Sequence, residues 1–162
     1  MSTTEGIPSQ ATAHDHRSGQ AQRRDLPRFV AEDGTVRDVV SVRLPAAAAY
    51  LAVLRTTTAS LAARLDFTLD EIEDLRIAVD EASCLLLAGA LPTSELSCVF
   101  EMSADSIQIA VSTETTDGRA PARDSFAWTV LSALAGEVDA WTEPDGRQTI
   151  SLVKRRAREA SA

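Results

Sequence analysis

Residues 66–90 read DFTLDEIEDLRIAVDEASCLLLAGA, and this stretch predicts one long helix. Thr68 and Glu71 stand three residues apart, which is the spacing of a capping box. Acidic residues crowd the first turns, where the helix dipole favours negative charge. An apolar stripe at helical spacing predicts the buried face: Ile72, Leu75, Val79, Ala82 and Leu86. Gly89 marks the expected end of the helix.

The segments on either side of this helix predict the rest of the fold. Apolar and polar residues alternate, as in half-buried strands, at 36–44, 95–103, 106–112, 138–142 and 148–154. Helical spacing predicts two further helices, at 46–65 and 125–135. The short link at Ala104-Asp105 indicates a β-hairpin. The order β-α-α-β-β-α-β-β predicts an α+β fold, with a mostly antiparallel sheet and helices on one face.

Composition divides the chain into one domain and two tails. Residues 1–35 are polar and hold few large apolar groups, so they cannot bury enough surface to offset the entropy of ordering. We therefore expect a disordered N-terminal tail. Residues 36–155 form the expected domain, and residues 156–162 a flexible C-terminal tail.

Charge and hydropathy exclude some classes of protein. The net charge of −8 at pH 7 argues against a nucleic-acid binder and suits solubility or a basic protein partner. No apolar run is long enough to span a membrane, and the N-terminus lacks the pattern of a signal peptide. We therefore expect a cytoplasmic protein.

Residues that commonly carry chemistry are sparse. The two cysteines, Cys84 and Cys98, are interpreted as buried thiols in a reduced cytoplasm, although the sequence alone leaves a disulfide open. Both histidines, His14 and His16, lie in the N-terminal tail, so a Ser/His/Asp triad is excluded. The sequence shows neither a Gly-rich phosphate loop nor metal-ligand spacing.

Two passages resemble a known family. They are LAVLRTTTASLAARLDFTLDEIEDLRIAVDEAS at 51–83 and DSFAWTVLSALAGEVDAW at 124–141. With the order of elements, they resemble the anti-sigma regulatory factor family, small proteins on the GHKL ATPase (Bergerat) fold. The similarity runs from about residue 36 to residue 155, and DLRIAVDEA at 74–82 is its most specific part. It is nearest to the actinobacterial members that regulate stress and stationary-phase sigma factors.

The resemblance implies roles for residues of the central helix. The family carries Glu-Ala-x-x-Asn there. The Glu acts as the general base when a serine of an antagonist protein is phosphorylated, and the Asn holds the Mg²⁺ of ATP. Glu81-Ala82 match the first two positions, which makes Glu81 the candidate base; an exposed helix carboxylate is the alternative. Leu85 stands at the Asn position, and leucine cannot coordinate Mg²⁺.

The other nucleotide motifs of the family match loosely. Asp117 and Gly118 stand near the family's Asp-x-Gly motif at the purine and are candidate nucleotide-binding residues. The family's Gly-x-Gly next to the third helix is absent, since Phe126 and Trp128 occupy this segment. We interpret the two aromatic side chains as filling the core or the groove; a partner-contact surface is the alternative.

These observations favour an anti-sigma factor that works by binding. It would sequester an alternative sigma factor and be released by an anti-anti-sigma antagonist. An active serine/threonine protein kinase that phosphorylates the antagonist is the alternative, and a structural protein unrelated to transcription is a third. No metal site and no cofactor are expected, whereas the kinase alternative needs ATP and Mg²⁺.

Two further expectations concern contacts between proteins. In the family, an arginine at the place of Arg55 contacts both the sigma factor and the antagonist, and a solvated or acid-paired arginine is the alternative. Family members usually pair through a sheet edge, and the strand at 38–44 has no second neighbour guaranteed by the sequence. We therefore expect a homodimer when no sigma factor is bound.

Overall fold

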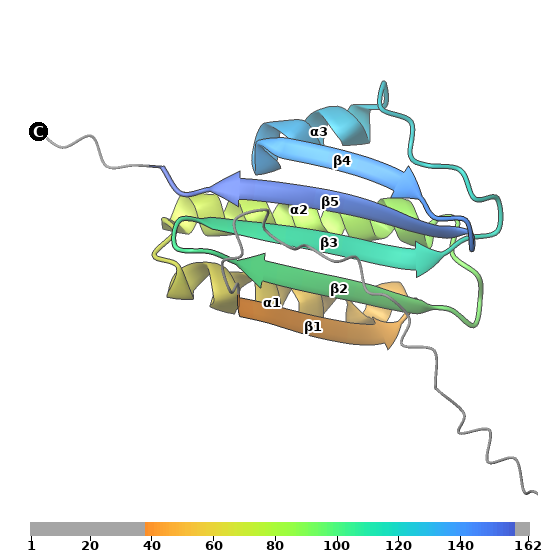
Figure 1. Ribbon diagram of the computed structural model, residues 1–162, viewed down its shortest axis with the longest axis horizontal. Helices are drawn as coiled ribbons and strands as arrows, with labels where there is room; N and C mark the ends of the chain where they lie inside the picture. The colour runs from red at the N-terminus through yellow and green to blue at the C-terminus, as the bar shows by residue number, and fades with distance from the viewer. Residues whose placement is uncertain (1–37, 158–162) are drawn as a thin grey trace, which may run out of the picture. The chain divides into compact units, whose positions relative to one another are not determined.

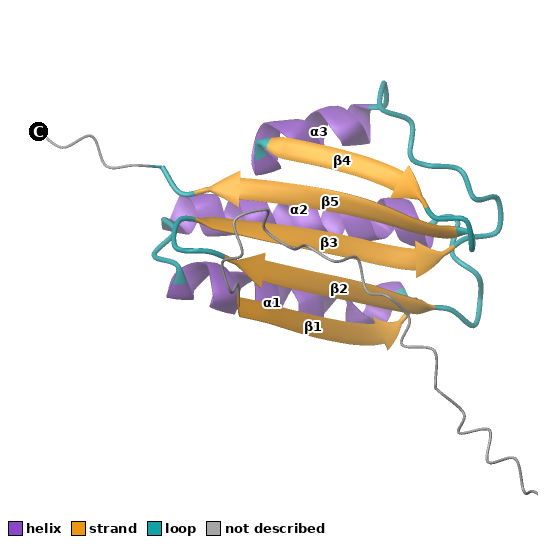
Figure 2. Cartoon of the chain, viewed as in Figure 1, coloured by secondary structure: helices purple, strands orange, loops and turns teal. Residues whose placement is uncertain are grey.

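The computed structural model describes residues 38–157. They form an antiparallel sheet with the order β1-β2-β3-β5-β4, and the three α-helices lie together on one face of it (Figures 1 and 2). The elements are β1 (Asp38–Pro45), the 3₁₀ helix η1 (Ala48–Tyr50), α1 (Leu51–Arg64), α2 (Leu69–Leu87), β2 (Glu95–Met102), β3 (Ser106–Glu114), α3 (Phe126–Ala135), β4 (Glu137–Thr142) and β5 (Arg147–Arg155). The predicted order and the α+β class are confirmed.

Sequence-based boundaries differ from the structure mainly at helix ends. The helix expected at 46–65 is split, because Ala48–Tyr50 forms a 3₁₀ turn before α1 begins at Leu51. Asp66 adopts a positive φ of 56° between α1 and α2, so α2 begins only at Leu69. Gly89 lies two residues beyond the end of α2, and its amide N–H donates to the carbonyl of Leu86.

The N-terminus of α2 has the predicted capping box. The Thr68 hydroxyl accepts from the amide N–H of Glu71 at 3.3 Å, and the Glu71 carboxylate accepts from the amide N–H of Thr68 at 2.8 Å. Two of the orphan amide groups of the first turn are thereby satisfied. The Glu71 carboxylate also accepts the amide N–H of Ala157, which fastens the end of β5 to this turn.

The core lies between the helices and one face of the sheet. One row across the sheet joins Val42, Cys98, Val111, Ile150 and Ala140 in register. From α2, Leu75, Val79, Ala82 and Leu86 meet this face with no exposed surface. A slip of one residue in any strand would exchange its core side chains for those of the opposite face, so the apolar alternation fixes the register.

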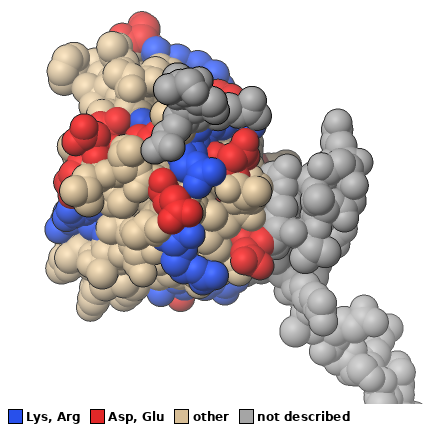
Figure 3. All heavy atoms as spheres, turned by 90° about the vertical axis from the view of Figure 1, so that its left-hand side faces the viewer, with Lys and Arg blue, Asp and Glu red and all other residues tan. Residues whose placement is uncertain are grey.

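Charged residues surround the end of the molecule at which α2 begins. Figure 3 views this end and shows acidic and basic side chains interspersed. Lys154 pairs with Asp74 at 3.0 Å, and Arg156 lies 3.7 Å from Asp66 and donates to the carbonyl of Leu65. Arg156 and Ala157, the first residues of the expected C-terminal tail, are thus bonded to the domain. The expected N-terminal tail and residues 158–162 lie outside the described residues.

Within residues 38–157, no helix combines the length and the apolar character that a transmembrane span requires.

Candidate functional site

Glu81 and Leu85 in the C-terminal half of α2, and Gly89 just beyond its end, form a row. They are spaced by four residues, so their side-chain positions follow one another along the helix. Glu81 and Leu85 are half-buried, and Leu85 packs against the hydrophobic core. The row spans about 12 Å from Glu81 to Gly89, given a rise of 1.5 Å per residue.

The loop after β3 is fastened to the end of this row. The amide N–H of Thr116 donates to the carbonyl of Gly89 at 2.9 Å, and that of Leu91 to the carbonyl of Glu114 at 3.0 Å. A Cβ atom added to Gly89 would lie 3.8 Å from a carboxylate oxygen of Asp117. The structure therefore brings Asp117 and Gly118 to the end of the row that Glu81 begins.

Asp117 and Gly118 themselves form a tight turn. The Asp117 carboxylate accepts the amide N–H of Arg119 at 3.2 Å, and Gly118 has a φ of +59°, in the region that favours glycine. One oxygen of Asp117 is therefore bonded within its own loop. The turn places an exposed carboxylate near the row.

These residues do not fit the Mg²⁺ complex of ATP. Leu85 stands between Glu81 and the Asp117 loop, where the family resemblance requires an amide ligand, and its side chain has no donor or acceptor atom. Among residues 38–157, no group of three or more His, Cys, Asp or Glu side chains could hold a metal ion. The site keeps the candidate base and lacks the group that would hold the metal.

The segment before α3 carries the two aromatic residues in different environments. Trp128 is 8% exposed and belongs to the core, and the Arg123 guanidinium lies 5.2 Å above its ring centre. Phe126 is 84% exposed, so the expectation that it fills the core or the groove is wrong. The buried side of α3 consists of Trp128, Leu131 and Ala135. Phe126 precedes Trp128 by two residues, so its side chain points about 200° away from that of Trp128.

Arg55 joins α1 to α2 beside the candidate base. Its guanidinium donates to the carboxylate of Asp80 at 2.6 Å, and the two side chains are 39% and 34% exposed. Successive helix residues point about 100° apart, so Asp80 and Glu81 lie on opposite flanks of the exposed side of α2. The Asp80 flank faces α1, as the ion pair shows, and Glu81 does not take part in it.

The outward side of α2 forms a continuous surface, here called the α2 ridge. It consists of Ile77, Asp80, Glu81 and Cys84, at the spacing of one helix face. Ile77 is 50% exposed, which the sequence could have indicated, since this isoleucine lies outside the predicted core stripe. A carboxylate pair and an apolar side chain therefore stand together on the surface.

Cys84 and Cys98 differ in exposure. Both are free thiols; Cys98 is buried as expected, but Cys84 is exposed, so the expectation of two buried thiols is wrong for it. Position 84 falls about 200° from both Ala82 and Leu86, away from the buried stripe. Partial desolvation and the neighbouring carboxylates of Asp80 and Glu81 raise the pKa of the Cys84 thiol. Burial raises the pKa of the Cys98 thiol far more strongly.

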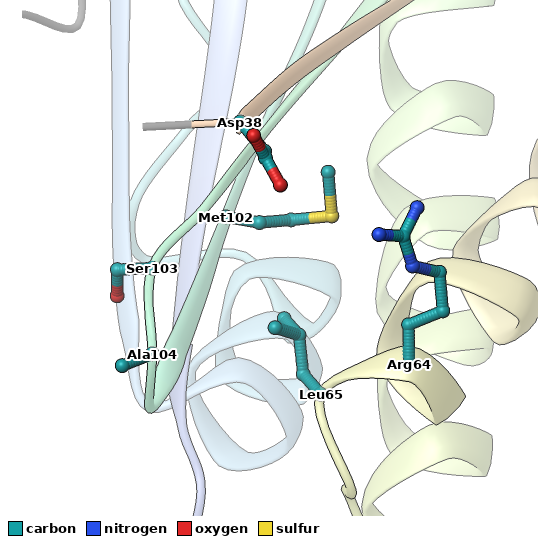
Figure 4. A pocket seen from close by; sticks show the side chains of 6 residues that line it. All are labelled: Asp38, Arg64, Leu65, Met102, Ser103 and Ala104. Atoms are coloured by element: carbon teal, nitrogen blue, oxygen red, sulfur yellow. The ribbon is translucent and has the colours of Figure 1, made fainter. Parts of the chain in front are cut away.

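A cavity of about 290 Å³ lies apart from these residues, at the C-terminal end of α1. Figure 4 shows the side chains of Arg64 and Asp38 pointing toward the same space beside Met102. The cavity is lined by Asp38, Arg64, Leu65, Met102, Ser103 and Ala104, so its described lining does not include the row on α2.

Comparison with known proteins gives matches over most of the chain. This chain is 37% identical over 143 residues to the anti-sigma-F factor RsbW of Mycobacterium tuberculosis (strain H37Rv), and the match covers 82% of this chain and 82% of that protein. It is 35% identical over 74 residues to the serine-protein kinase RsbW of Bacillus cereus (strain Q1), which covers 44% of this chain and 46% of that protein. No protein-family model matches the chain.

A solved structure supports the same fold. The crystal structure of the RsbU and RsbW domains of Rv1364c from Mycobacterium tuberculosis matches with a TM-score of 0.56 at 16% identity. The match covers 76% of this chain and 34% of that longer chain. At this identity the similarity concerns the fold alone, and it agrees with the GHKL-like architecture expected from the sequence.

Proposed function

The chain belongs to the RsbW family of anti-sigma factors, and from this premise we propose that it is an anti-sigma factor that acts by binding. It sequesters an alternative sigma factor of the stress or stationary-phase type, and an anti-anti-sigma antagonist releases it. A cytoplasmic location is part of this proposal, since a sigma factor acts on transcription there. The relative that matches over 82% of its length is itself named an anti-sigma-F factor.

The observation that carries this proposal is that α2 keeps the features that define the fold but lacks the residue that would hold Mg²⁺. Its fold-defining features are kept: the capping box, the apolar stripe and the Glu81-Ala82 pair. Leu85, however, replaces the side chain that would hold Mg²⁺ and is packed against the core. A domain with an intact scaffold and a defective metal site is suited to binding a protein rather than to transferring phosphate.

The α2 ridge with Arg55 is the surface we assign to the partners. It combines an exposed apolar side chain, Ile77, with the half-exposed Arg55–Asp80 pair. Interfaces use apolar anchors and arginines in this way, because an apolar contact excludes water from the charged bonds beside it. Arg55 can exchange its bond to Asp80 for a bidentate bond to a carboxylate of a partner.

Affinity purification tests the proposal. The chain is tagged and purified from the native cell, and the proteins it retains are identified by mass spectrometry, with a sigma factor expected among them. Ile77→Asp should weaken the purified complex by about 2 kcal/mol, or roughly thirtyfold in Kd, as for a central contact. Leu69→Asp is the matched control, since Leu69 is 81% exposed on the same helix but outside the ridge. Retention of no sigma factor, or equal effects of both variants, contradicts the proposal.

An active serine kinase is the second candidate, and two observations favour it. Glu81 is half-exposed at the position of the family's base, and relatives that match over part of the chain are named serine-protein kinases. We expect weak or no binding of ATP with Mg²⁺, because Leu85 offers no ligand atom. Titration calorimetry with and without Mg²⁺ separates the candidates. A micromolar dissociation constant that requires Mg²⁺ would support the kinase.

A further inference from the structure

The cavity beside Arg64 and Asp38, here called the α1 cavity, has walls from three elements. Arg64 and Leu65 come from the C-terminal end of α1, Asp38 from the start of β1, and Met102 from the end of β2. Its volume is about 290 Å³, and ligand pockets in proteins measure about 300–1,000 Å³. The α1 cavity is therefore of a size for a ligand much smaller than a nucleotide.

The sheet register places Asp38 on the side of the helices. Val40 and Val42 pack against the core, and side chains two residues apart on a strand share a face. Asp38 is the register partner of Met102, which is 5% exposed and belongs to the core. Arg64 approaches from the opposite wall, as the last residue of α1. Figure 4 shows the carboxylate and the guanidinium on either side of the Met102 thioether.

Hydrogen bonds fix the walls of the α1 cavity. In the turn between β2 and β3, the amide N–H of Ser103 donates to the carbonyl of Ser106 at 3.0 Å, and the two hydroxyl oxygens lie 2.6 Å apart. At the end of α1, the carbonyl of Leu65 accepts from the Arg156 guanidinium at 3.1 Å. A cavity whose walls are already ordered costs little conformational entropy when a ligand enters it.

The charges of the α1 cavity select the class of ligand. Asp38 and Arg64 are exposed, and neither forms an ion pair within the part of the chain that the structure describes. Their formal charges cancel, so a polyphosphate would gain from Arg64 and be repelled by Asp38. A ligand with one carboxylate and one ammonium group satisfies both. Met102 and Leu65 add an apolar wall, which suits an aliphatic or thioether side chain.

We propose that the α1 cavity binds a free α-amino acid with an apolar side chain. The Arg64 guanidinium donates to the carboxylate of the ligand, and the ammonium group of the ligand donates to the Asp38 carboxylate. The side chain of the ligand packs against Met102 and Leu65. This inference does not depend on the proposed function, because the cavity shares no residue with the α2 ridge or with Arg55.

Titration of the full chain with L-leucine and L-methionine, followed by amide NMR shifts, tests the proposal. We expect saturable shifts at residues 64–66 and 102–104, with a dissociation constant of roughly 1 mM or below for so small a ligand. Two analogues of leucine lack one charge each: 4-methylvaleric acid has no ammonium group, and isopentylamine has no carboxylate. Each should bind at least tenfold more weakly. Equal binding of leucine and either analogue, or no saturable shift at these residues, would overturn the proposal.

Substitutions of the two charged residues identify the site. Asp38→Asn and Arg64→Gln should each weaken L-leucine binding at least tenfold, with an unchanged circular dichroism spectrum, because both residues are exposed. Arg43→Gln is the matched control and should bind L-leucine as the wild type does. Arg43 is an exposed arginine of β1 whose neighbours Val42 and Leu44 face the core, so it points to the other side of the sheet. Unchanged affinity in Asp38→Asn and Arg64→Gln, or an equal loss in Arg43→Gln, would overturn the assignment.

Discussion

Arg55 carries the most direct residue-scale prediction. Its ion pair with Asp80 is about a third exposed on both sides, so it contributes only about 0–1 kcal/mol to stability. Arg55→Ala should therefore leave the fold intact, while a central interface arginine contributes about 2 kcal/mol or more to binding. We expect weaker binding of both the sigma factor and the antagonist. Isothermal titration with each partner, beside a circular dichroism spectrum, measures the effect.

Arg76→Ala is the matched control for Arg55→Ala. Arg76 also forms an ion pair, with Glu73, and its side chain is 37% exposed, close to the 39% of Arg55. It lies outside the α2 ridge, so its loss should leave both affinities unchanged. Unchanged affinities for Arg55→Ala would remove this residue from the interface. Because both partners are expected to contact Arg55, they should compete for one overlapping surface, and simultaneous binding of both would contradict this expectation.

Single residues also show where sequence reasoning succeeds. The central stripe of α2 and the row of Glu81 and Leu85 were predictable, because nineteen helical residues define the phase of the helix. Phe126 was placed wrongly because it is the first residue of a ten-residue helix, where the pattern is too short to fix the phase. Cys84 was predicted to be buried because cysteine is buried in most proteins. Its position outside the apolar stripe of α2 was the better indicator of its exposure.

At the scale of one element, the capping box of α2 predicts a pH dependence. Partial burial raises the pKa of Glu71, but the amide N–H groups of Ala157 and Thr68 outweigh it and lower the pKa below its ordinary value. The ionised form is thus favoured by folding. Its contribution to stability is present above the unfolded pKa of about 4.3 and is lost as the pH falls through the lower folded value.

Glu71→Gln tests this contribution. At pH 7 we expect a loss of about 0.5–1 kcal/mol of unfolding free energy, since the neutral amide loses the interaction with the helix dipole. The difference from the wild type should shrink as the pH falls below the unfolded pKa of about 4.3 and through the lower folded value. Urea unfolding at several pH values measures it, with Asp70→Asn as the control for a neighbouring first-turn acid that is exposed. A pH-independent difference would show that the amide bonds, and not the charge, are responsible.

Element boundaries depend on contacts that the sequence does not display. The hairpin of β2 and β3 was predictable, because two alternating runs are joined by a three-residue link at 103–105. The end of α2 was expected at Gly89, yet the helix stops at Leu87. The carbonyl of Gly89 accepts the amide N–H of Thr116 instead, and such a long-range bond cannot be read from local spacing.

For the whole molecule, the sheet edges decide how copies can associate. At the β4 edge, the Ala140 amide N–H donates to the Asp139 side chain and the Ala140 carbonyl accepts from Arg123. Both backbone groups are thus occupied by side chains, which blunts this edge. Hydrogen bonds from Arg123 and from the amide N–H of Ala140 lower the pKa of Asp139, so its carboxylate stays ionised. The β1 edge, paired with β2 on one side, remains the candidate for dimerisation.

We therefore predict a homodimer through β1 when no partner is bound. Copies that each carry a net charge of −8 repel one another, so association should strengthen with salt as the repulsion is screened. Light scattering from low to high micromolar protein, in 0.05 and 0.5 M salt, should show the mass rising from monomer toward dimer. Ser41→Asp adds a charge to the β1 edge and should favour the monomer, whereas Thr129→Asp, on exposed α3 surface, should not. A monomer at high micromolar concentration in 0.5 M salt would rule out the dimer.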